Sequence, residues 1–149
     1  MVAESRVGEW DRKEMIALDE AFRQLRKLIA AEWDKESIGG LNVTQARILI
    51  ILAESGPLKA SVLAETLFVT SGAVTGLADQ LIEMDLIRRE RPESDRRVVL
   101  LDITPAGHQL VEAIHAKRIG IMERLVKELE EPEVLELTRL ISKIVSTPR

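Results

Sequence analysis

Two adjacent arginines stand beside an aspartate in the segment Pro92–Arg97, and these three side chains are the clearest candidates for chemistry in the chain. A solvent-exposed turn needs only some polar residues, whereas Arg96 and Arg97 add two guanidinium groups. Such groups are attracted to regions of negative potential, among them the grooves of nucleic acids. A solvated turn fits the same charges, so their meaning depends on the elements that position them.

A second group of candidates lies upstream, on a segment predicted to be a helix. The hydroxyl of Thr70 suits a helix cap, because it can accept a hydrogen bond from the first turn. Apolar residues then recur with helical spacing and predict a buried stripe of Val74, Leu77, Ala78, Leu81 and Ile82. The opposite face carries Ser71, Gly72, Thr75, Gly76 and Asp79. Nothing on that face obstructs the close approach of a partner.

Three further helices are predicted on the amino-terminal side of this one. Apolar residues every three or four positions predict an amphipathic helix over about residues 11–33. Asn42 and Gln45 form a capping-box pair before the next helix. Gly56–Pro57 ends that helix, because glycine accepts a positive φ and proline cannot continue the helix. A short helix follows at about residues 60–67.

A β-hairpin and two helices are predicted on the carboxy-terminal side. Residues 86–91 and 97–103 are rich in β-prone side chains and are separated by the turn 92–95. Thr104 followed by proline is typical of a helix start, and this helix is expected to reach about residue 130. Pro132 opens a last amphipathic helix. The predicted fold class is therefore mainly α with a small β-hairpin.

This order of elements is that of a winged helix-turn-helix flanked by extra helices, and the residues resemble the MarR family of bacterial transcription regulators. The segment Leu63–Thr75 resembles the helix-turn-helix of that family. Asp95 and Arg97, followed by Ile103–Thr104, resemble its wing signature of Asp-x-Arg and Leu-Thr, with isoleucine for leucine. The similarity covers about residues 41–107, and the two motifs stand in the order and spacing that the family has.

The resemblance implies one domain over residues 1–149, with a winged helix-turn-helix at about 41–104 and dimerisation helices at about 11–33 and 105–147. The helix after Thr70 would lie in a major groove of DNA and the hairpin in a minor groove. The residues expected to contact DNA are Thr70, Ser71, Gly72, Thr75, Gly76, Arg96 and Arg97. Arg97 is expected to reach into the groove, and Asp95 to hold it.

The function implied is that of a cytoplasmic, homodimeric, DNA-binding regulator, expected to act as a repressor at a pseudo-palindromic operator. Relatives often bind small aromatic anions, so a small aromatic or anionic effector is expected to release the DNA. No residue of its pocket is indicated, and no cofactor is expected. A winged helix that docks protein instead of DNA is the alternative within the class of binding proteins.

The sequence departs from the family pattern at three positions. Gly76 stands where many relatives carry a long polar or basic side chain, which removes a potential contact with a base. Lys59 replaces the usual Ser or Thr cap of the short helix, and Asp85 stands where glycine often ends the helix after Thr70. Specificity is therefore expected to depend on Thr75, the hairpin and the shape of the DNA.

Composition restricts the classes of function further. The formal charge of −4 argues against indiscriminate binding to nucleic acid, and any DNA site must be a local basic patch. Residues 59–99 carry 6 basic and 7 acidic side chains, which sum to −1, but five of the basic ones are arginines of the hairpin. The chain has no cysteine, which excludes thiol redox sensing. No apolar run approaches the ~20 residues of a membrane helix, so no membrane partner is expected.

One other cluster could do chemistry. His108, Glu112 and His115 follow helical spacing and would share one face, which could hold a metal ion in a metal-responsive regulator or serve a hydrolase. A polar helix face is more often only solvated. The sequence has no nucleophile elbow, no phosphate-binding glycine loop and no His-Glu-x-x-His pattern, so an enzyme is not expected.

Overall fold

Polar side chains cap the amino termini of four helices in the computed structural model, which describes residues 10–36 and 38–149. The caps are Asp11 for α1 (Arg12–Lys35), Asn42 for α2 (Val43–Ser55), Thr70 for α4 (Ser71–Glu83) and Thr104 for α5 (Pro105–Leu125). Each side-chain oxygen accepts a hydrogen bond from a backbone N–H that the first turn leaves unpaired. The predicted caps at Asn42, Thr70 and Thr104 are confirmed.

Positive φ angles follow α2, α3 and α4, and those after α2 and α4 were expected from the sequence. Gly56 follows α2 with φ 76°. Asp85 follows α4 with φ 60°, and it takes the left-handed conformation that glycine often supplies here. Lys59 precedes α3 (Ala60–Leu67), and its side chain makes no capping hydrogen bond.

The chain divides into two compact units, residues 1–36 and residues 37–149. The first unit contains α1, which confirms the amphipathic helix predicted for residues 11–33. Its large apolar side chains are exposed: Met15, Ile16, Leu18, Phe22, Leu25 and Leu28. A stripe of this kind needs a second apolar surface to cover it.

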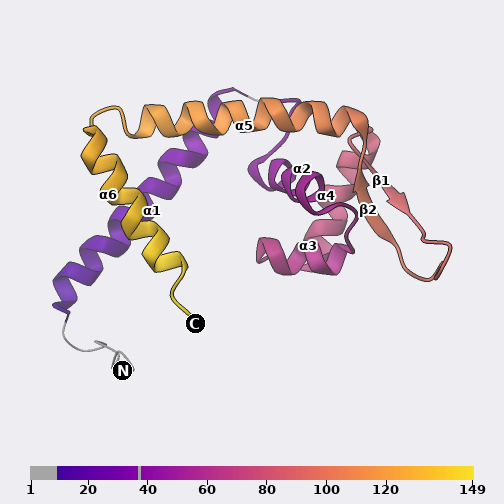
Figure 1. The fold of residues 1–149 in the computed structure, drawn as a ribbon, viewed down its shortest axis with the longest axis horizontal. Helices are drawn as coiled ribbons and strands as arrows, with labels where there is room; N and C mark the ends of the chain where they lie inside the picture. The colour runs from indigo at the N-terminus through magenta and orange to yellow at the C-terminus, as the bar shows by residue number, and fades with distance from the viewer. Residues whose placement is uncertain (1–9, 37) are drawn as a thin grey trace. The chain divides into compact units, whose positions relative to one another are not determined.

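The core of the second unit is built around α2, which contacts α3, α4, α5 and β2 (Figure 1). Its largest fully buried side chains are Ile48, Leu49, Leu52, Leu63, Val74, Leu81, Ile87 and Ile114. Of the stripe predicted on α4, Val74, Ala78 and Leu81 are buried. Close packing of these apolar groups fixes how α3 and α4 lie against the rest of the unit.

The hairpin consists of β1 (Ile87–Glu90) and β2 (Leu100–Ile103), which pair antiparallel with Ile87 opposite Ile103. A single bridge joins Leu58 to Leu101 and ties the segment before α3 to β2. Both strands are shorter than predicted, because residues 91–99 form a loop of two successive turns. In that loop, side chains take up backbone groups that a longer ladder would have used, and Pro92 has no N–H to donate.

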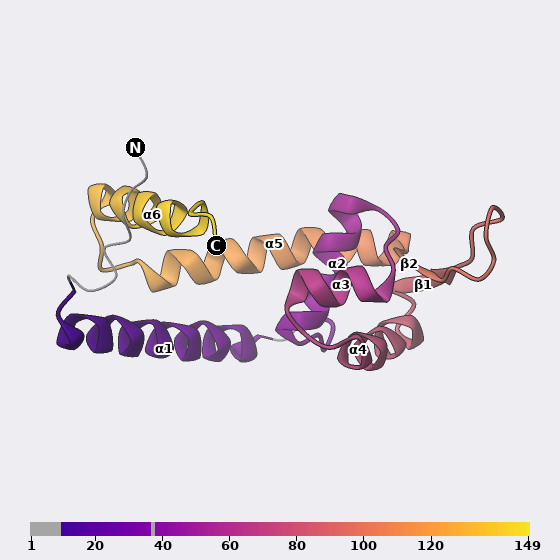
Figure 2. The same ribbon diagram turned by 90° about the horizontal axis from the view of Figure 1, so that it is seen from below.

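The prediction that α5 continues to residue 130 was wrong, because α5 ends at Leu125. Residues 126–129 turn, and Glu130 adopts an extended conformation before α6 (Glu131–Val145). The Glu130 N–H donates to the carboxylate of Glu133, which favours a new helix start over continuation of α5. Figures 1 and 2 show α5 running past α2 and carrying α6 at its far end.

No residue of α6 is buried. Its exposed large apolar side chains are Leu135, Leu137, Leu140, Ile141, Ile144 and Val145. Across residues 10–36 and 38–149, no single helix is long and apolar enough to cross a membrane. Only α3 and α4 taken together pass that test, and they are bent by 111° at the break between them.

Candidate nucleic-acid interface

The amino-terminal half of α4 presents an exposed face of small and polar residues. That face contains Ser71, Gly72, Thr75 and Gly76, as the sequence predicted, and the cap Thr70 beside it is also exposed. The hydroxyl oxygen of Thr70 accepts from the Ala73 N–H at 3.1 Å. The N–H groups of Ser71 and Gly72 belong to the first turn, where a helix offers them no acceptor. They are therefore available to an anion such as a phosphate.

Two glutamines hold α4 against α2. Gln45 is buried, and its Nε2 donates to Oε1 of Gln80 at 2.7 Å. Oε1 of Gln45 accepts from the Asn42 N–H at 3.1 Å, so one side chain both caps α2 and positions α4. From the sequence, Gln45 was predicted only as a cap. A pair separated by 35 residues leaves no local pattern from which Gln80 could have been found.

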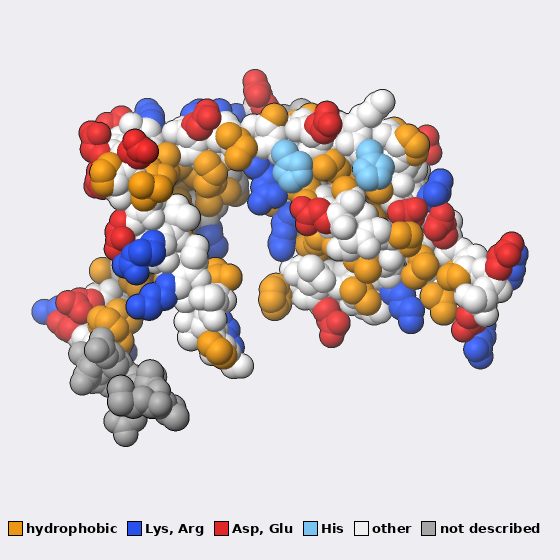
Figure 3. Space-filling view, viewed as in Figure 1, with side chains coloured by type: hydrophobic (Ala, Val, Ile, Leu, Met, Phe, Trp, Pro, Cys, Tyr) orange, Lys and Arg blue, Asp and Glu red, His pale blue; other side chains and the backbone are white. Residues whose placement is uncertain are grey.

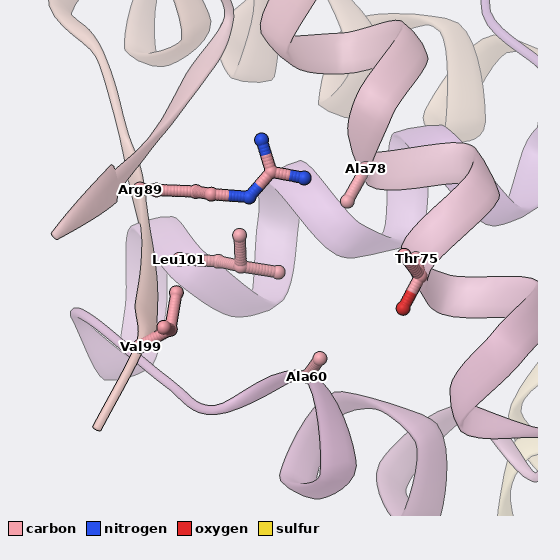
Figure 4. A pocket seen from close by; sticks show the side chains of 6 residues that line it. All are labelled: Ala60, Thr75, Ala78, Arg89, Val99 and Leu101. Atoms are coloured by element: carbon pink, nitrogen blue, oxygen red, sulfur yellow. The ribbon is translucent and has the colours of Figure 1, made fainter. Parts of the chain in front are cut away.

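Thr75 has one hydrogen-bonding role already filled. Its hydroxyl donates to the Ser71 carbonyl at 3.0 Å, so the oxygen keeps only acceptor capacity toward a partner. The side chain faces a shallow hollow of about 220 Å³ between α4, α3 and the hairpin (Figure 4). The remaining lining residues are Ala60, Ala78, Arg89, Val99 and Leu101. Thr75 therefore suits a hydrogen-bond donor on a base edge, or an apolar contact through its methyl group.

Packing does not require glycine at Gly72 or Gly76. A Cβ added at Gly76 would meet nothing within 4 Å, and one at Gly72 would meet only the Thr70 hydroxyl at 4.0 Å. Glycine in a helix interior is less favourable than alanine by about 1 kcal/mol. Gly76 therefore reduces the stability of α4 without a gain inside the protein, and both glycines leave its backbone open to close approach.

The hairpin loop presents Arg97 on a carboxylate fork. Nε and the backbone N–H of Arg97 both donate to Oδ1 of Asp95 at 3.1 Å, and Nη2 donates to Oδ2 at 3.3 Å. The Arg97 side chain is 91% exposed and that of Asp95 is 41% exposed. These bonds hold the pKa of Asp95 below its ordinary value, with a smaller contribution from the charge of Lys59. The predicted pairing of Asp95 with Arg97 is confirmed.

The other hairpin arginines differ in their hydrogen-bond and ion-pair partners. Arg88 pairs with Glu90 and Asp102, and Arg89 pairs with Asp79 of α4. Arg91 donates from Nη1 to the Arg96 carbonyl at 2.9 Å and so closes the loop. The Arg96 side chain has no hydrogen bond or ion pair within the described part of the chain. Basic and acidic side chains gather at the hairpin tip (Figure 3). Arg96 and Arg97, in the loop, are both exposed.

A threonine and a glycine fix the hairpin to α4 and α5. The Thr104 hydroxyl donates to the Asp85 carbonyl at 2.7 Å while it accepts from the Gly107 N–H at 3.1 Å. A Cβ at Gly107 would overlap the Leu86 carbonyl oxygen and come within 2.6 Å of Ile103 Cγ1. Thr104 was predicted as a cap, but Gly107 was not identified from the sequence, because close approach between segments distant along the chain gives no local signal.

The proposed metal cluster is not assembled. His108, Glu112 and His115 lie on α5 and are exposed. In residues 10–36 and 38–149, no group of three or more histidine, aspartate or glutamate side chains is placed so that it could hold a metal ion. The spacing i, i+4, i+7 puts the three on one side of the helix over two turns, and their side chains do not converge on one point.

Comparison with known proteins agrees with this geometry. The MarR family model matches residues 41–99. The HTH-type transcriptional repressor MdtR of Bacillus subtilis is 32% identical over 129 residues, which cover 87% of this chain and 81% of that protein. Among solved structures, the YusO protein of B. subtilis is 30% identical with a TM-score of 0.67, covering 91% of this chain and 94% of that one.

A more distant structure shares the fold. BpsR of Bordetella bronchiseptica, whose DNA binding is described as regulated by 6-hydroxynicotinic acid, aligns with a TM-score of 0.76 at 21% identity. The alignment covers 87% of this chain and 99% of that chain. The winged helix-turn-helix predicted from the sequence is confirmed by these comparisons and by the hairpin that follows α4. The chain belongs to the MarR family of helix-turn-helix transcriptional regulators.

Proposed function

We propose that the protein binds double-stranded DNA as a homodimer in the cytoplasm and regulates transcription by binding, not by catalysis. The observation that carries the proposal is the pairing of an unobstructed α4 face with a hairpin loop that carries two exposed arginines, Arg96 and Arg97. An α-helix fits the major groove, and guanidinium groups favour the negative potential of a minor groove.

The residues divide into two roles. The first turn of α4, with the N–H groups of Ser71 and Gly72, contacts phosphate and sets the orientation of the helix. Thr75 faces base edges, and the bare backbone at Gly76 lets the helix enter deeply. Arg96 and Arg97 lie along the minor groove, with Asp95 limiting the rotamers of Arg97. The hydroxyl oxygen of Thr70 remains with the helix cap.

The experiment is a binding titration with duplexes from the protein's own upstream region. Specific binding should exceed binding to a scrambled duplex of equal length by about a thousandfold or more at physiological salt. Footprinting should show two half-sites about one helical turn apart. Equal binding to both duplexes, or none, would contradict the proposal and favour a winged helix that docks protein.

The exposed apolar faces support the homodimer. Neither α1 nor α6 is covered within its own unit, and exposed apolar area of this extent marks an interaction surface. We therefore propose that residues 1–149 act as one domain only in the dimer. Deletion from Glu133 onward should give aggregated or unfolded protein. A monomeric full-length protein at micromolar concentration in sedimentation experiments would contradict this assembly.

We propose repression and release by a small aromatic or anionic effector as the mode of regulation. One relative is named a repressor, and another protein of the same fold is described as regulated by an aromatic acid. The hollow in Figure 4 has apolar walls and is bordered by Arg89, which would exchange its ion pair with Asp79 for the acidic group of an effector. Its volume of about 220 Å³ admits a single-ring molecule. Aromatic carboxylates should release the operator in a titration. Unchanged affinity across such a panel would contradict an effector of this class.

A further inference from the structure

Phe68, in the turn between α3 and α4, is unfavourable by two independent measures. Its backbone has φ 56° and ψ 43°, the left-handed conformation that an L-residue other than glycine adopts at a cost of about 1–2 kcal/mol. The residue is 93% exposed, the largest exposure among the large apolar residues of the described part of the chain. An exposed aromatic ring in a left-handed backbone adds nothing to the packing of the folded protein.

The backbone at this position has a structural role that needs no aromatic side chain. The Phe68 N–H donates to the Glu65 carbonyl at 3.2 Å, and the Val69 N–H donates to the Ala64 carbonyl at 3.0 Å. These bonds close α3 and set the direction of the chain into α4. Glycine would close the helix equally well and without strain, since it is the usual residue in such helix ends. The ring therefore needs a reason outside the fold.

The surroundings of the ring indicate the kind of surface it would meet. Phe68 borders an open hollow that also includes Ser61, Ala64, Glu65, Val69 and Ser71. No lysine or arginine lines this hollow, and none occurs in α4. The carboxylate of Glu65 would repel a phosphate placed there. The partner surface at this point is therefore one that an uncharged, apolar contact can recognise.

We propose that Phe68 is a DNA-contacting residue that packs its ring on the apolar surface of the operator, either deoxyribose or the C5-methyl of thymine. The inference rests on the proposed function, because it takes α4 to enter a major groove by its amino-terminal half. Phe68 stands two residues before the cap Thr70 and borders the same hollow as Ser71, so it lies where that half meets the groove edge. An apolar contact with the thymine methyl is a known element of base readout.

The test uses the full chain and an upstream duplex that the wild-type protein binds. Phe68→Gly removes the ring and the backbone strain together, so its Tm should equal or exceed that of the wild type. Its affinity for the duplex should fall about tenfold or more, as expected when an aromatic ring is no longer buried against the DNA. The slope of affinity against salt should stay unchanged, because no charge is removed. Phe68→Ala should show the same drop in affinity without a loss of fold.

A matched control is Met84→Ala, which removes an exposed apolar side chain at the other end of α4 and should leave the affinity unchanged. Duplexes with deoxyuridine in place of thymidine distinguish the two surfaces. If the wild-type protein binds the deoxyuridine duplex more weakly than the thymidine duplex, and Phe68→Gly binds both duplexes equally, the ring contacts the thymine methyl group. If the affinity of Phe68→Gly is lower than that of the wild type by the same factor on both duplexes, the ring contacts deoxyribose.

Three results would overturn the inference, and they can be told apart. Wild-type affinity in both Phe68 variants, on a duplex that the wild type binds, removes Phe68 from the interface and leaves the proposed function standing. Parallel loss of Tm and affinity in both variants makes Phe68 a structural residue. Failure of the wild type to prefer any upstream duplex over a scrambled one ends the proposed function, and this inference with it.

Discussion

The exposed face of α4 and the hairpin loop 91–99 differ in the side chains they expose and in the contacts that hold them in place. The face of α4 has no basic side chain, and buried apolar residues together with the Gln45–Gln80 pair hold the helix in place. The loop carries three arginines, and exposed polar contacts hold it, chiefly the Asp95–Arg97 fork and the Arg91 bond to the Arg96 carbonyl. The position of α4 is thus coupled to the stability of the fold, whereas the loop can change without unfolding.

The largest effect is expected where the two regions are joined. Gly107→Ala should lower the free energy of unfolding by about 3 kcal/mol, because its Cβ would overlap the Leu86 carbonyl oxygen. Urea denaturation measures this. Gly120→Ala in the same helix is the control, since its Cβ meets only Arg124 Nη1 at 3.5 Å. It should gain roughly 1 kcal/mol. Equal stability of the two variants would show that the junction is not tightly packed.

Arg97→Ala should weaken operator binding by about ten- to hundredfold while leaving Tm nearly unchanged. The side chain is 91% exposed, and an exposed ion pair contributes little to folding. Anisotropy titration and thermal unfolding give the two quantities. Arg88→Ala is the matched control, because that guanidinium lies on β1 outside the loop and two carboxylates, of Glu90 and Asp102, bind it. A drop in affinity for Arg88→Ala as large as that for Arg97→Ala would mean that the hairpin acts only through net charge.

Gly76→Ala should separate stability from binding on α4. The new methyl group meets open space, so the free energy of unfolding should rise by about 0.5–1 kcal/mol. The affinity for the operator should fall several-fold, because the methyl group would hold the helix away from the groove. The same titration and denaturation experiments measure both. Unchanged affinity would mean that the α4 backbone does not approach the DNA closely at this position.

The smallest effect concerns the charge of Asp95. Its pKa lies below the ordinary value of 3.8, so the carboxylate is charged from about pH 5 to 8 and its pairing adds no pH dependence there. The stabilisation that the Asp95–Arg97 pair contributes is present at higher pH, and it is lost only as the pH falls through the lowered pKa of Asp95. NMR titration should show this pKa, and Arg97→Ala should return it toward 3.8. A value unaffected by Arg97→Ala would mean that the fork does not persist in solution.

The sequence predicted the elements whose signals are local. The caps at Asn42, Thr70 and Thr104, the bounds of α3 and the left-handed residue after α4 all depend on one residue and its near neighbours. The errors arose where competing bonds decide. In the loop 91–99, side chains take the backbone groups and shorten both strands, and after Leu125 the Glu130–Glu133 bond starts a new helix.

The candidate site followed the same division. The residues on the exposed face of α4 and the Asp95–Arg97 pair were predictable from helical spacing and from a short motif. The Gln45–Gln80 and Asp79–Arg89 pairs and the close approach at Gly107 were not, because each joins residues distant in sequence. Phe68 was not identified either, because its left-handed backbone and its exposure leave no signal in the sequence.

The hairpin loop should supply the charge of the interface, and α4 should supply none. The direct test is the slope of log affinity against log salt for the wild type, for Arg96→Ala combined with Arg97→Ala, and for Gly76→Ala, all on one duplex. The double variant should reduce the slope by about 0.9 for each phosphate that an arginine no longer neutralises, and Gly76→Ala should keep the wild-type slope while binding more weakly. An unchanged slope in the double variant, or a reduced slope in Gly76→Ala, would contradict this division of roles.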